Sequence, residues 1–477
     1  MGGLFGCCTE RECVMDLFFG TDYHSHLGTR RGGMAVYNGK NFVRAIHNIE
    51  NSPFRTKFES DLTEMKGLSG VGCISDDHPQ PIILNTRIGT MAVVTVGKIN
   101  NKEALTEELI RENDVYFTEM SDGRVNDTEL VAALICRRDN IPDGIRYAQS
   151  RIEGSLTMLA AADGGIYAAR DRFGRTPLFI GKKCGGEAGF CASMESFAYV
   201  NLEYETHHEL GPGEIVFFDA EKMIRVAPPQ QEMKMCTFLW LYYGFPASDY
   251  QGMNVEEMRC SCGRSMARDD TARGRAVDVD YVAGVPDSGT PHAIGYANES
   301  GIPFARPLIK YTPTWPRSFT PKDQSIRNLI ARMKLTPVHS LIRGKKLMLI
   351  DDSIVRGTQL RGVMDALFSY GAKELHGRIG CPPLLHNCKY LNFTRSASEN
   401  ENIARRAIAK LEGNETPSEE TVAEYGEFGC PKYNAMVNEI RKKLNFTTLE
   451  YHSLDGMLAC SGQEKCKLCT YCWNGKE

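Results

Sequence analysis

The stretch Leu347-Met348-Leu349-Ile350-Asp351-Asp352-Ser353-Ile354-Val355-Arg356-Gly357-Thr358 decides the fold of the second half of this chain. Its first four residues are all apolar, which is typical of a strand buried inside a parallel sheet. Two aspartates end the strand, a polar turn follows, and apolar residues at helical spacing predict a helix that ends near Gly371. This order of strand, loop and helix predicts an α/β domain with a ligand site, because a helix N-terminus offers unpaired N–H groups to a phosphate.

The side chains of this turn suit a phosphorylated sugar. Gly357 lets the backbone approach an anion, and Ser353 and Thr358 add hydroxyl donors. Asp351 and Asp352 would repel a phosphate, so we expect them to contact ribose hydroxyls and a magnesium ion. For a bare Asp-Asp-Ser, a polar turn that caps a helix is the simpler interpretation, but the length of the whole string favours the ligand site.

The length and composition favour several domains and no membrane span. A chain of 477 residues suits two or three domains, and a net charge of −4 gives no basic surface for nucleic acid. The longest apolar runs fall far short of the roughly 20 residues that cross a membrane. The N-terminus lacks a secretory pattern, and Gly6 stands where a myristoylation signal wants Ser or Thr. We therefore expect a cytoplasmic protein.

The two halves of the chain differ in pattern. Up to about residue 227, short β-rich runs alternate with turns, and Asn126 followed by Glu129 predicts the start of one helix. Residues 228–231 look like a linker, and beyond them apolar runs alternate with helical patterns up to about residue 389. Residues 396–427 are rich in Glu, Asn, Ala and Arg, so we expect an exposed helical insertion without chemistry.

Seventeen cysteines in a chain expected in a reducing compartment favour thiols or metal ligands over disulfides. Cys466 and Cys469 form a Cys-x-x-Cys pair, which Cys472 extends. Zinc is the default ion for four thiolates, and buried structural cysteines beside surface thiols are the alternative. The spacing alone leaves both interpretations open.

The string around Asp351 resembles the phosphoribosyl pyrophosphate (PRPP) signature of type I phosphoribosyltransferases, in the form found in the amidophosphoribosyltransferase family. Residues 284–303, beginning Gly-Val-Pro-Asp-Ser, are similar to the family's pyrophosphate-contacting segment. The resemblance implies that Ser288 joins the aspartate pair around magnesium. It also implies a PRPP-binding set formed by Asp287, Lys310, Arg317, Asp351, Asp352, Ser353, Ile354, Val355, Arg356, Gly357 and Thr358. Tyr311 departs from the family's mobile loop, where an Asn is usual.

The same resemblance implies the domain organisation. Residues 1–231 would form an α+β glutamine amidotransferase domain, a sandwich of two sheets between helices of the type that carries an N-terminal nucleophile. Residues 232–389 would form an α/β type I phosphoribosyltransferase domain with a parallel sheet. Residues 390–477 would be a C-terminal extension that holds the insertion and the clustered cysteines.

One subgroup of the family holds a four-iron, four-sulfur cluster with four cysteines. The positions that match here are Cys236, Cys388, Cys466 and Cys469. A cluster bound in this way would join the linker, the end of the α/β domain and the C-terminal tail. Cys460 and Cys472 lie close by in the sequence and remain alternatives.

The N-terminal half resembles a glutaminase that lacks its catalytic groups. Gly2 stands where the family has its nucleophilic cysteine, and glycine supplies an α-amine without a sulfur. Ser75 replaces the arginine that holds the glutamine carboxylate, and Val96 replaces the asparagine that stabilises the oxyanion. Asp127 keeps the family's residue. We therefore predict that this half does not hydrolyse glutamine.

Two functions are compatible with these motifs. The first is an enzyme that uses magnesium to make phosphoribosylamine from PRPP and ammonia. The ammonia would be free or would come from a separate glutaminase, and we expect the enzyme to be a homo-oligomer. The second is a regulatory homologue that binds PRPP or a nucleotide without turnover. Leu239 and Phe245, where the family usually has Glu and Arg, favour the second.

Overall fold

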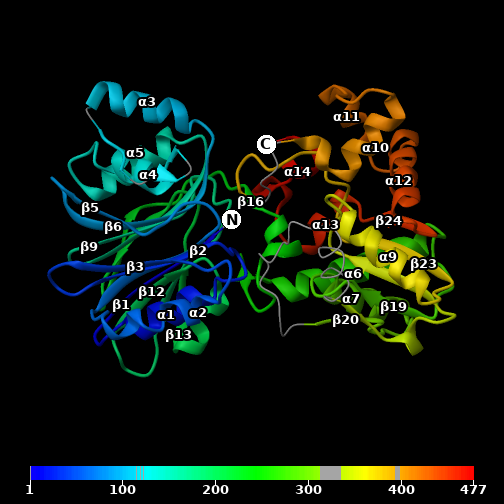
Figure 1. Ribbon diagram of the computed structural model, residues 1–477, viewed down its shortest axis with the longest axis horizontal. Helices are drawn as coiled ribbons and strands as arrows, with labels where there is room; N and C mark the ends of the chain where they lie inside the picture. The colour runs from blue at the N-terminus through cyan, green and yellow to red at the C-terminus, as the bar shows by residue number, and fades with distance from the viewer. Residues whose placement is uncertain are drawn as a thin grey trace.

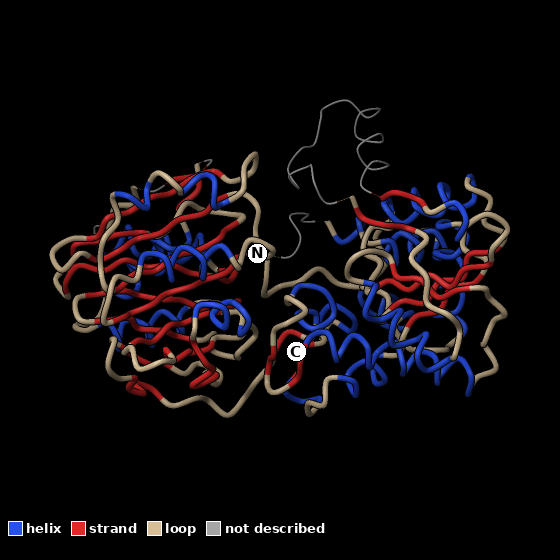
Figure 2. The backbone as a smooth tube through the Cα atoms, turned by 90° about the horizontal axis from the view of Figure 1, so that it is seen from below, coloured by secondary structure: helices blue, strands red, loops and turns tan. Residues whose placement is uncertain are grey.

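The computed structural model describes residues 2–113, 115–118, 120–121, 123–311, 335–392 and 398–476. These residues form two lobes side by side along the long axis of the molecule (Figure 1). Figure 2 shows that strands dominate the N-terminal lobe, whereas helices flank a smaller sheet in the other. None of the helices in the described ranges combines the length and the apolar character needed to cross a membrane.

The N-terminal lobe is built on two antiparallel sheets. In spatial order the first sheet contains β13 (Tyr204–Glu209), β11 (Phe179–Lys183), β12 (Gly189–Ser193), β1 (Gly2–Thr9), β4 (Ser69–Ser75), β2 (Arg31–Tyr37) and β3 (Phe42–Asn48). The second contains β15 (Met223–Ala227), β14 (Ile215–Phe218), β10 (Gly165–Ala169), β9 (Gly154–Ala162), β6 (Gly89–Ile99) and β5 (Ile82–Thr86). A short hairpin joins β7 (Met120–Ser121) and β8 (Arg124–Val125).

Helices cover the outer faces of this pair of sheets. They are α1 (Val14–Asp22), α2 (Phe54–Phe58), α3 (Lys102–Asn113), α4 (Asp127–Ile135) and α5 (Ile141–Arg151), with the 3₁₀ turns η1 (Asp61–Thr63) and η2 (Ser196–Leu202). Helices α1 and α2 lie on the side of the first sheet, and α3, α4 and α5 on the side of the second (Figure 1). Leu4, Val71, Val94 and Leu159 pack between the sheets. This sandwich confirms the expected fold class of the N-terminal half.

The predicted start of the helix at residue 126 is confirmed. The Asn126 side chain accepts a hydrogen bond from Thr128 N at 2.9 Å, which satisfies one of the unpaired amides of the first turn. Glu129 does not complete a capping box here, because it accepts hydrogen bonds from the backbone and side chain of Thr118 instead. Asp127 therefore lies on the first turn of α4.

The second lobe contains a sheet of four parallel strands, which confirms the α/β class of this half. In spatial order they are β19 (Tyr281–Gly284), β22 (Lys346–Asp351), β23 (Glu374–Ile379) and β24 (Thr448–Tyr451). Helices α6 (Val255–Ala272) and α7 (Gly289–Ser300) cover one face of the sheet. Met266 of α6 and Ala293 of α7 share a buried apolar cluster with Met348 of β22. Helices α9 (Thr358–Ser369) and α12 (Pro431–Leu444) belong to the core on the other. The segment after residue 389, expected as an extension, supplies the fourth strand.

Shorter elements connect these parts. They are the π-helical turn η3 (Leu239–Tyr243), the 3₁₀ turns η4 (His339–Leu341), η5 (Glu399–Glu401) and η6 (Lys465–Lys467), the hairpins β17 (Asp249–Tyr250) with β18 (Met253–Asn254) and β20 (Leu308–Lys310) with β21 (Leu335–Pro337), and the helices α10 (Ile403–Glu412), α11 (Glu419–Tyr425), α13 (Leu454–Cys460) and α14 (Tyr471–Asn474). Between the lobes, β16 (Met235–Cys236) pairs in parallel with β25 (Leu468–Cys469).

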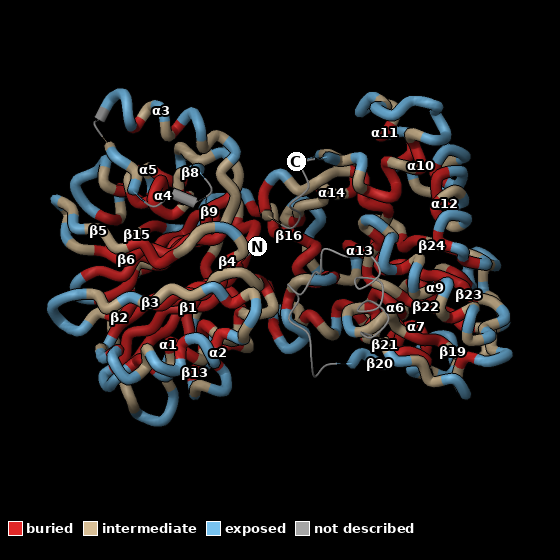
Figure 3. Tube along the Cα trace, viewed as in Figure 1, coloured by how far each residue is buried: buried red, intermediate tan, exposed pale blue. Residues whose placement is uncertain are grey.

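The expectation of an exposed insertion at residues 396–427 is wrong for α10. Ile403, Ala404 and Ile408 are buried in the same core as α9 and α12, whereas α11 is more exposed (Figure 3). The apolar residues of α10 recur at helical spacing and form one buried stripe. The scarcity of aromatic residues concealed this stripe, because composition alone does not show how side chains are arranged around a helix.

Candidate functional site

The parallel pairing of β19 and β22 brings the two phosphoribosyl motifs to one edge of the sheet. Gly284 lies beside Ile350 in register, so the residues that follow each strand leave the sheet next to one another. Asp287 and Ser288 follow β19, whereas Asp351 ends β22 and Asp352 comes directly after it. These side chains are therefore neighbours at the carboxyl edge, where open α/β sheets bind ligands.

Asp351 and Asp352 form a partly buried pair of carboxyl groups. Asp352 is 3% exposed, and its Oδ1 accepts a hydrogen bond from Ser353 Oγ at 2.6 Å. Burial raises the pKa of Asp351, and the charge of Asp352 raises it further. Burial also raises the pKa of Asp352, against hydrogen bonds from Ser288 and Ser353. Two buried carboxyl groups with raised pKa values fit a divalent cation, because oxygen ligands and a double positive charge relieve their repulsion.

Lys310 lies at the same edge, on β20. Its Nζ pairs with Asp287 Oδ2 at 2.5 Å, and both side chains are substantially exposed. Lys310, which was expected in the PRPP-binding set, is thus paired with Asp287 of the same set. Arg317, the other basic residue expected here, lies outside the described residues, and Tyr311 is the last residue before that gap.

The loop after the aspartates turns directly into α9. Gly357 has a φ of +74°, which favours glycine, and the helix begins at Thr358. A Cβ at Gly357 would lie 2.6 Å from Ile403 Cδ1 and 3.0 Å from Leu444 Cδ2. The sequence explained this glycine by the approach of an anion. The structure adds two further reasons why a glycine is needed at position 357: its left-handed backbone and its close packing against α10 and α12.

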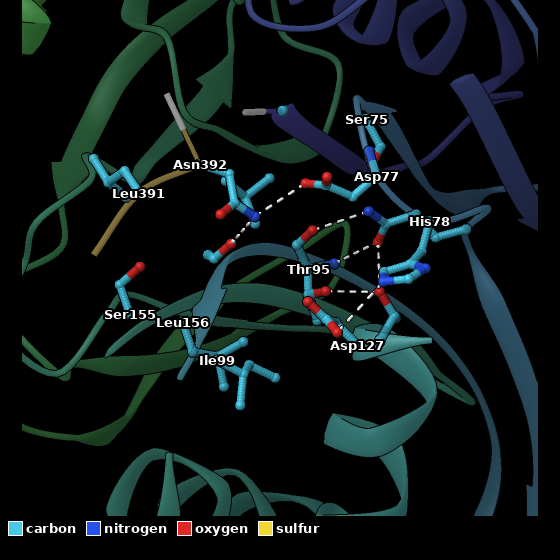
Figure 4. A pocket seen from close by; sticks show the side chains of 15 residues that line it. Ser75, Asp77, His78, Thr95, Ile99, Asp127, Ser155, Leu156, Leu391 and Asn392 are labelled. Atoms are coloured by element: carbon cyan, nitrogen blue, oxygen red, sulfur yellow. Dashed lines mark hydrogen bonds and ion pairs between the residues drawn. The ribbon is translucent and has the colours of Figure 1, made fainter. Parts of the chain in front are cut away.

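A pocket lies at the start of β1, between the two sheets and a loop from the C-terminal half (Figure 4). Its lining residues are Gly2, Ser75, Asp77, His78, Gln80, Thr95, Val96, Gly97, Ile99, Asp127, Thr128, Ser155, Leu156, Leu391 and Asn392. Gly2 pairs with Ser75 across β1 and β4. A Cβ at Gly2 would lie 2.4 Å from the carbonyl oxygen of Ile74, closer than any real side chain approaches backbone. The residues predicted from sequence to replace three catalytic groups are thus gathered in one pocket.

Asp127, where the chain keeps the family's residue, is paired with Lys102 and His78 of the same chain. Its Oδ1 lies 2.5 Å from Lys102 Nζ and 3.4 Å from His78 Nε2. Burial by itself would raise the pKa of Asp127, but the hydrogen bonds and charges of His78 and Lys102 outweigh it and hold the pKa below its usual value. The only carboxylate predicted to remain from the glutamine site is therefore neutralised internally.

Residues 388–392 cover the pocket from the other lobe, which the sequence did not indicate. Ser155 Oγ donates to the carbonyl oxygen of Tyr390 at 2.5 Å, and Lys98 Nζ donates to that of Cys388 at 3.0 Å. The Asn392 amide donates to Asp77 Oδ2 at 3.1 Å (Figure 4). A short segment between β23 and β24 thus closes the N-terminal pocket.

Four cysteines line a second cavity, which lies between the lobes. They are Cys236, Cys388, Cys469 and Cys472, together with Arg175, Phe238, Tyr390, Leu391 and Trp473. The Cys472 thiol, the backbone amide of Leu391 and the charges of Lys98 and Arg175 hold the pKa of Cys388 below its usual value, although burial opposes them. Leu391 lines both this cavity and the N-terminal pocket.

The structure corrects the expected set of cysteines. Cys466 is exposed on η6, and its Sγ lies 3.8 Å from Glu464 Oε2 rather than in the cavity. Cys472, on α14, takes its place, so the inward Cys-x-x-Cys pair is Cys469 with Cys472. Cys460 belongs elsewhere, because its Sγ donates to the carbonyl oxygen of Gly456 on α13 and its thiol pairs with Cys262.

The spacing of the four sulfur atoms bears on which metal group they fit. A single zinc ion with Zn–S bonds of about 2.3 Å holds its sulfur atoms about 3.8 Å apart. Among the described residues, no three of these four sulfur atoms lie within 4.8 Å of one another. The described cysteines are therefore not arranged as three or four ligands of one zinc ion.

Comparison with known proteins agrees with this architecture. A family model for a glutamine amidotransferase domain matches residues 70–198. The amidophosphoribosyltransferase of Mycobacterium tuberculosis is 30% identical over 490 residues, which cover 99% of this chain and 85% of that protein. That of Methanocaldococcus jannaschii is 29% identical and covers 100% and 97%. The structure of glutamine PRPP amidotransferase from B. subtilis, complexed with ADP and GMP, superposes with a TM-score of 0.83 at 27% identity, covering 99% and 96%.

The fold, the N-terminal pocket and the carboxyl edge of the parallel sheet define a glutamine amidotransferase domain joined to a phosphoribosyltransferase domain. The chain belongs to the amidophosphoribosyltransferase family.

Proposed function

We propose that this protein forms phosphoribosylamine from PRPP and ammonia, and that it does not hydrolyse glutamine. The observation that carries the first part is the convergence of Ser288, Asp351, Asp352 and the Lys310–Asp287 pair at the carboxyl edge, beside the N-terminus of α9. The names of the relatives support the same reaction, since an amidophosphoribosyltransferase transfers an amine to a phosphoribosyl group. The reaction belongs to purine biosynthesis, and a second structure that this chain matches is that of the allosteric regulatory enzyme of purine biosynthesis.

The residues of this chain account for binding and for charge. The unpaired amides at the start of α9 hold the 5′-phosphate, and the aspartate pair orients the ribose hydroxyls. Ammonia then attacks the anomeric carbon as its bond to pyrophosphate breaks, and Lys310 neutralises the departing oxygens once it leaves Asp287. Magnesium, held by Ser288, Asp351 and Asp352, would supply further charge neutralisation at the pyrophosphate.

The proposed loss of the glutaminase rests on the N-terminal pocket. The chain has no side chain at Gly2, and the neighbouring carbonyl leaves no room for one. Ser75 and Val96 supply neither the guanidinium for a substrate carboxylate nor the amide for an oxyanion. Asp127 is already paired with Lys102. Ammonia would therefore come from solution or from a separate glutaminase.

We further propose that Cys236, Cys388, Cys469 and Cys472 hold a [4Fe-4S] cluster. The four cysteines that line one cavity and the positive charges of Lys98 and Arg175 near Cys388 support it, because a cluster held by four thiolates is an anion. Its position between β16, β25 and residues 388–392 gives the cluster a structural role at the junction of the lobes.

A regulatory protein that binds PRPP or a nucleotide without turnover is the second candidate. Phe245, where the family usually has Arg, stacks on Phe197 with ring centroids 3.9 Å apart. Leu239, where Glu is usual, is buried in the apolar core between the lobes. Two positions expected to carry charge therefore serve apolar packing, which favours binding without chemistry.

Release of pyrophosphate separates these functions. With PRPP and magnesium, the enzyme should release pyrophosphate when ammonium is added and should not when glutamine replaces it. Asp352→Asn should weaken PRPP binding at least about tenfold, or about 1.4 kcal/mol, whereas Asp365→Asn, an exposed change on α9, should leave it unaltered. PRPP binding measured by calorimetry without turnover on ammonium would identify the regulatory protein, and glutamate release from glutamine would contradict the loss of the glutaminase.

A further inference from the structure

The first residues of α10 donate hydrogen bonds to carbonyl groups of the phosphate loop, by which we mean residues 353–357 before α9. The backbone amide of Ile403 donates to the carbonyl oxygen of Val355 at 2.8 Å. Arg406 Nη2 donates to the carbonyl oxygen of Arg356 at 2.5 Å. Two consecutive peptide groups of the loop are thus turned toward α10, in a segment for which the sequence predicted no chemistry.

The planarity of the peptide bond gives these contacts a consequence on the opposite side of the loop. In a trans peptide the C=O group and the following N–H group point in opposite directions, and neither of these peptides is cis. Holding the carbonyls of Val355 and Arg356 against α10 therefore directs the amides of Arg356 and Gly357 away from it. Within the described part of the chain, neither amide donates to another residue. They join the unpaired amides at the start of α9, where a phosphate would bind.

Other contacts fix the position of α10 relative to the loop. Ile403 is 1% exposed and would contact any side chain at Gly357, so it leaves the loop no room to shift toward α10. The Arg356 side chain pairs with Glu401, just before α10 begins. Arg405, which is buried, anchors the helix by donating to Glu399, Glu419 and the carbonyl oxygen of Leu385. The donors at Ile403 and Arg406 are thus held on a rigid element.

We propose that Arg406 is a positioning residue for the 5′-phosphate site: it acts through the Arg356 carbonyl and does not touch the ligand. The proposal rests on the proposed function, because it assigns the 5′-phosphate to this loop. Removing the guanidinium frees the Arg356–Gly357 peptide to rotate, so that its amide no longer faces the phosphate. Among the described residues, no hydrogen bond or ion pair joins Arg406 to the pyrophosphate region after β19, which should be unaffected.

The binding of two ligands distinguishes a positioning role of Arg406 from general damage to the fold. Ribose 5-phosphate tests the loop, and magnesium pyrophosphate tests the edge around Ser288. Calorimetry on the full-length protein should show Arg406→Ala binding ribose 5-phosphate about tenfold more weakly, with magnesium pyrophosphate unchanged. Arg406→Lys, which keeps a donor and the charge, should recover most of the affinity. Lys410→Ala, on the same helix but paired with Glu439, is the matched control and should bind both ligands as the parent does.

The outcomes are distinguishable. Unchanged binding of ribose 5-phosphate by Arg406→Ala would overturn the inference, and so would an equal loss of both ligands. Arg406→Met, which keeps the length of the side chain, replaces alanine if that variant does not fold. If the unaltered protein binds neither ligand, the proposed function itself fails, a result different from an insensitive Arg406 variant.

Discussion

Gly2 lies where the first strand meets the N-terminal pocket, and a single absent side chain there has two effects. It removes the sulfur that a glutaminase of this type needs, and it allows β1 to approach Ile74 so closely that a Cβ has no space. The absence of a side chain at Gly2 is therefore also part of how β1 packs. Restoring the lost atom is then not a neutral change, because the neighbouring backbone must move to accept it.

Gly2→Cys tests this reasoning, provided that mass spectrometry shows Met1 to be removed. We expect no useful glutamine hydrolysis, because Ser75 and Val96 still lack the carboxylate clamp and the oxyanion donor. Two missing interactions of about 2–4 kcal/mol each leave the site roughly 10³ to 10⁶ below a competent glutaminase. The measurement is glutamate release, with Gly2→Ala as the control for the added Cβ alone. Near-normal glutamate release by Gly2→Cys would show that the pocket is otherwise intact.

At the scale of elements, the direction of short segments decides which cysteines meet. The parallel pairing of β16 with β25 brings Cys236 beside Cys469, and α14 then turns Cys472 toward the same cavity. Cys466 precedes β25 on η6, where its side chain is exposed. In a run with cysteines at every third position, the sequence cannot show which adjacent pair faces inward.

The cysteine assignment predicts different effects of two neighbouring variants. Cys472→Ala should lose most of the iron of the anaerobically purified protein, together with its visible absorbance, because one of four thiolates is missing. Cys466→Ala should keep about four irons per chain and the absorbance of the parent. Iron and sulfide analysis measures both. Loss of iron in Cys466→Ala alone would restore the assignment expected from the sequence, and a colourless parent with one zinc per chain would replace the cluster by zinc.

At the scale of the whole molecule, both lobes bury neutral histidines. Burial lowers the pKa of His24 in the N-terminal lobe to about 4, against Glu195 and the Gly20 carbonyl. Burial also lowers the pKa of His292 to about 3 and that of His452 to about 4 in the other lobe. In the unfolded chain each imidazole would titrate near its ordinary value of about 6.5. At mildly acidic pH these histidines therefore stay neutral in the folded state but are protonated in the unfolded state.

This difference predicts acid sensitivity of the fold. Between about pH 6.5 and pH 4 the unfolded chain binds more protons, so stability present above about pH 6.5 is lost as the pH falls. For His24 the loss at about pH 5 amounts to about 2 kcal/mol. Urea unfolding at about pH 7 and about pH 5 measures it. His24→Gln should reduce the difference between the two midpoints, and exposed His207→Gln should not. An equal pH dependence in the parent and His24→Gln would contradict the role of burial.

The sequence by itself determined the fold of the ligand edge and the residues on which the proposed loss of the glutaminase rests. The strand from Leu347 to Ile350, the aspartates after it and the helix ending near Gly371 are found as predicted, because apolar periodicity and glycine at a helix end are local properties. Gly2, Ser75 and Val96 were identified from the resemblance to the family, and the structure gathers them in one pocket.

Only the tertiary structure decided which distant residues act together. The choice of Cys472 over Cys466, the neutralisation of Asp127 by Lys102 and the covering of the N-terminal pocket by residues 388–392 all depend on contacts between separate elements. The hold of α10 on the phosphate loop belongs with them, because Ile403 and Arg406 lie some fifty residues beyond the carbonyls that they bind. Local sequence specifies strands, turns and helices, whereas the partners of a buried polar group depend on how those elements pack.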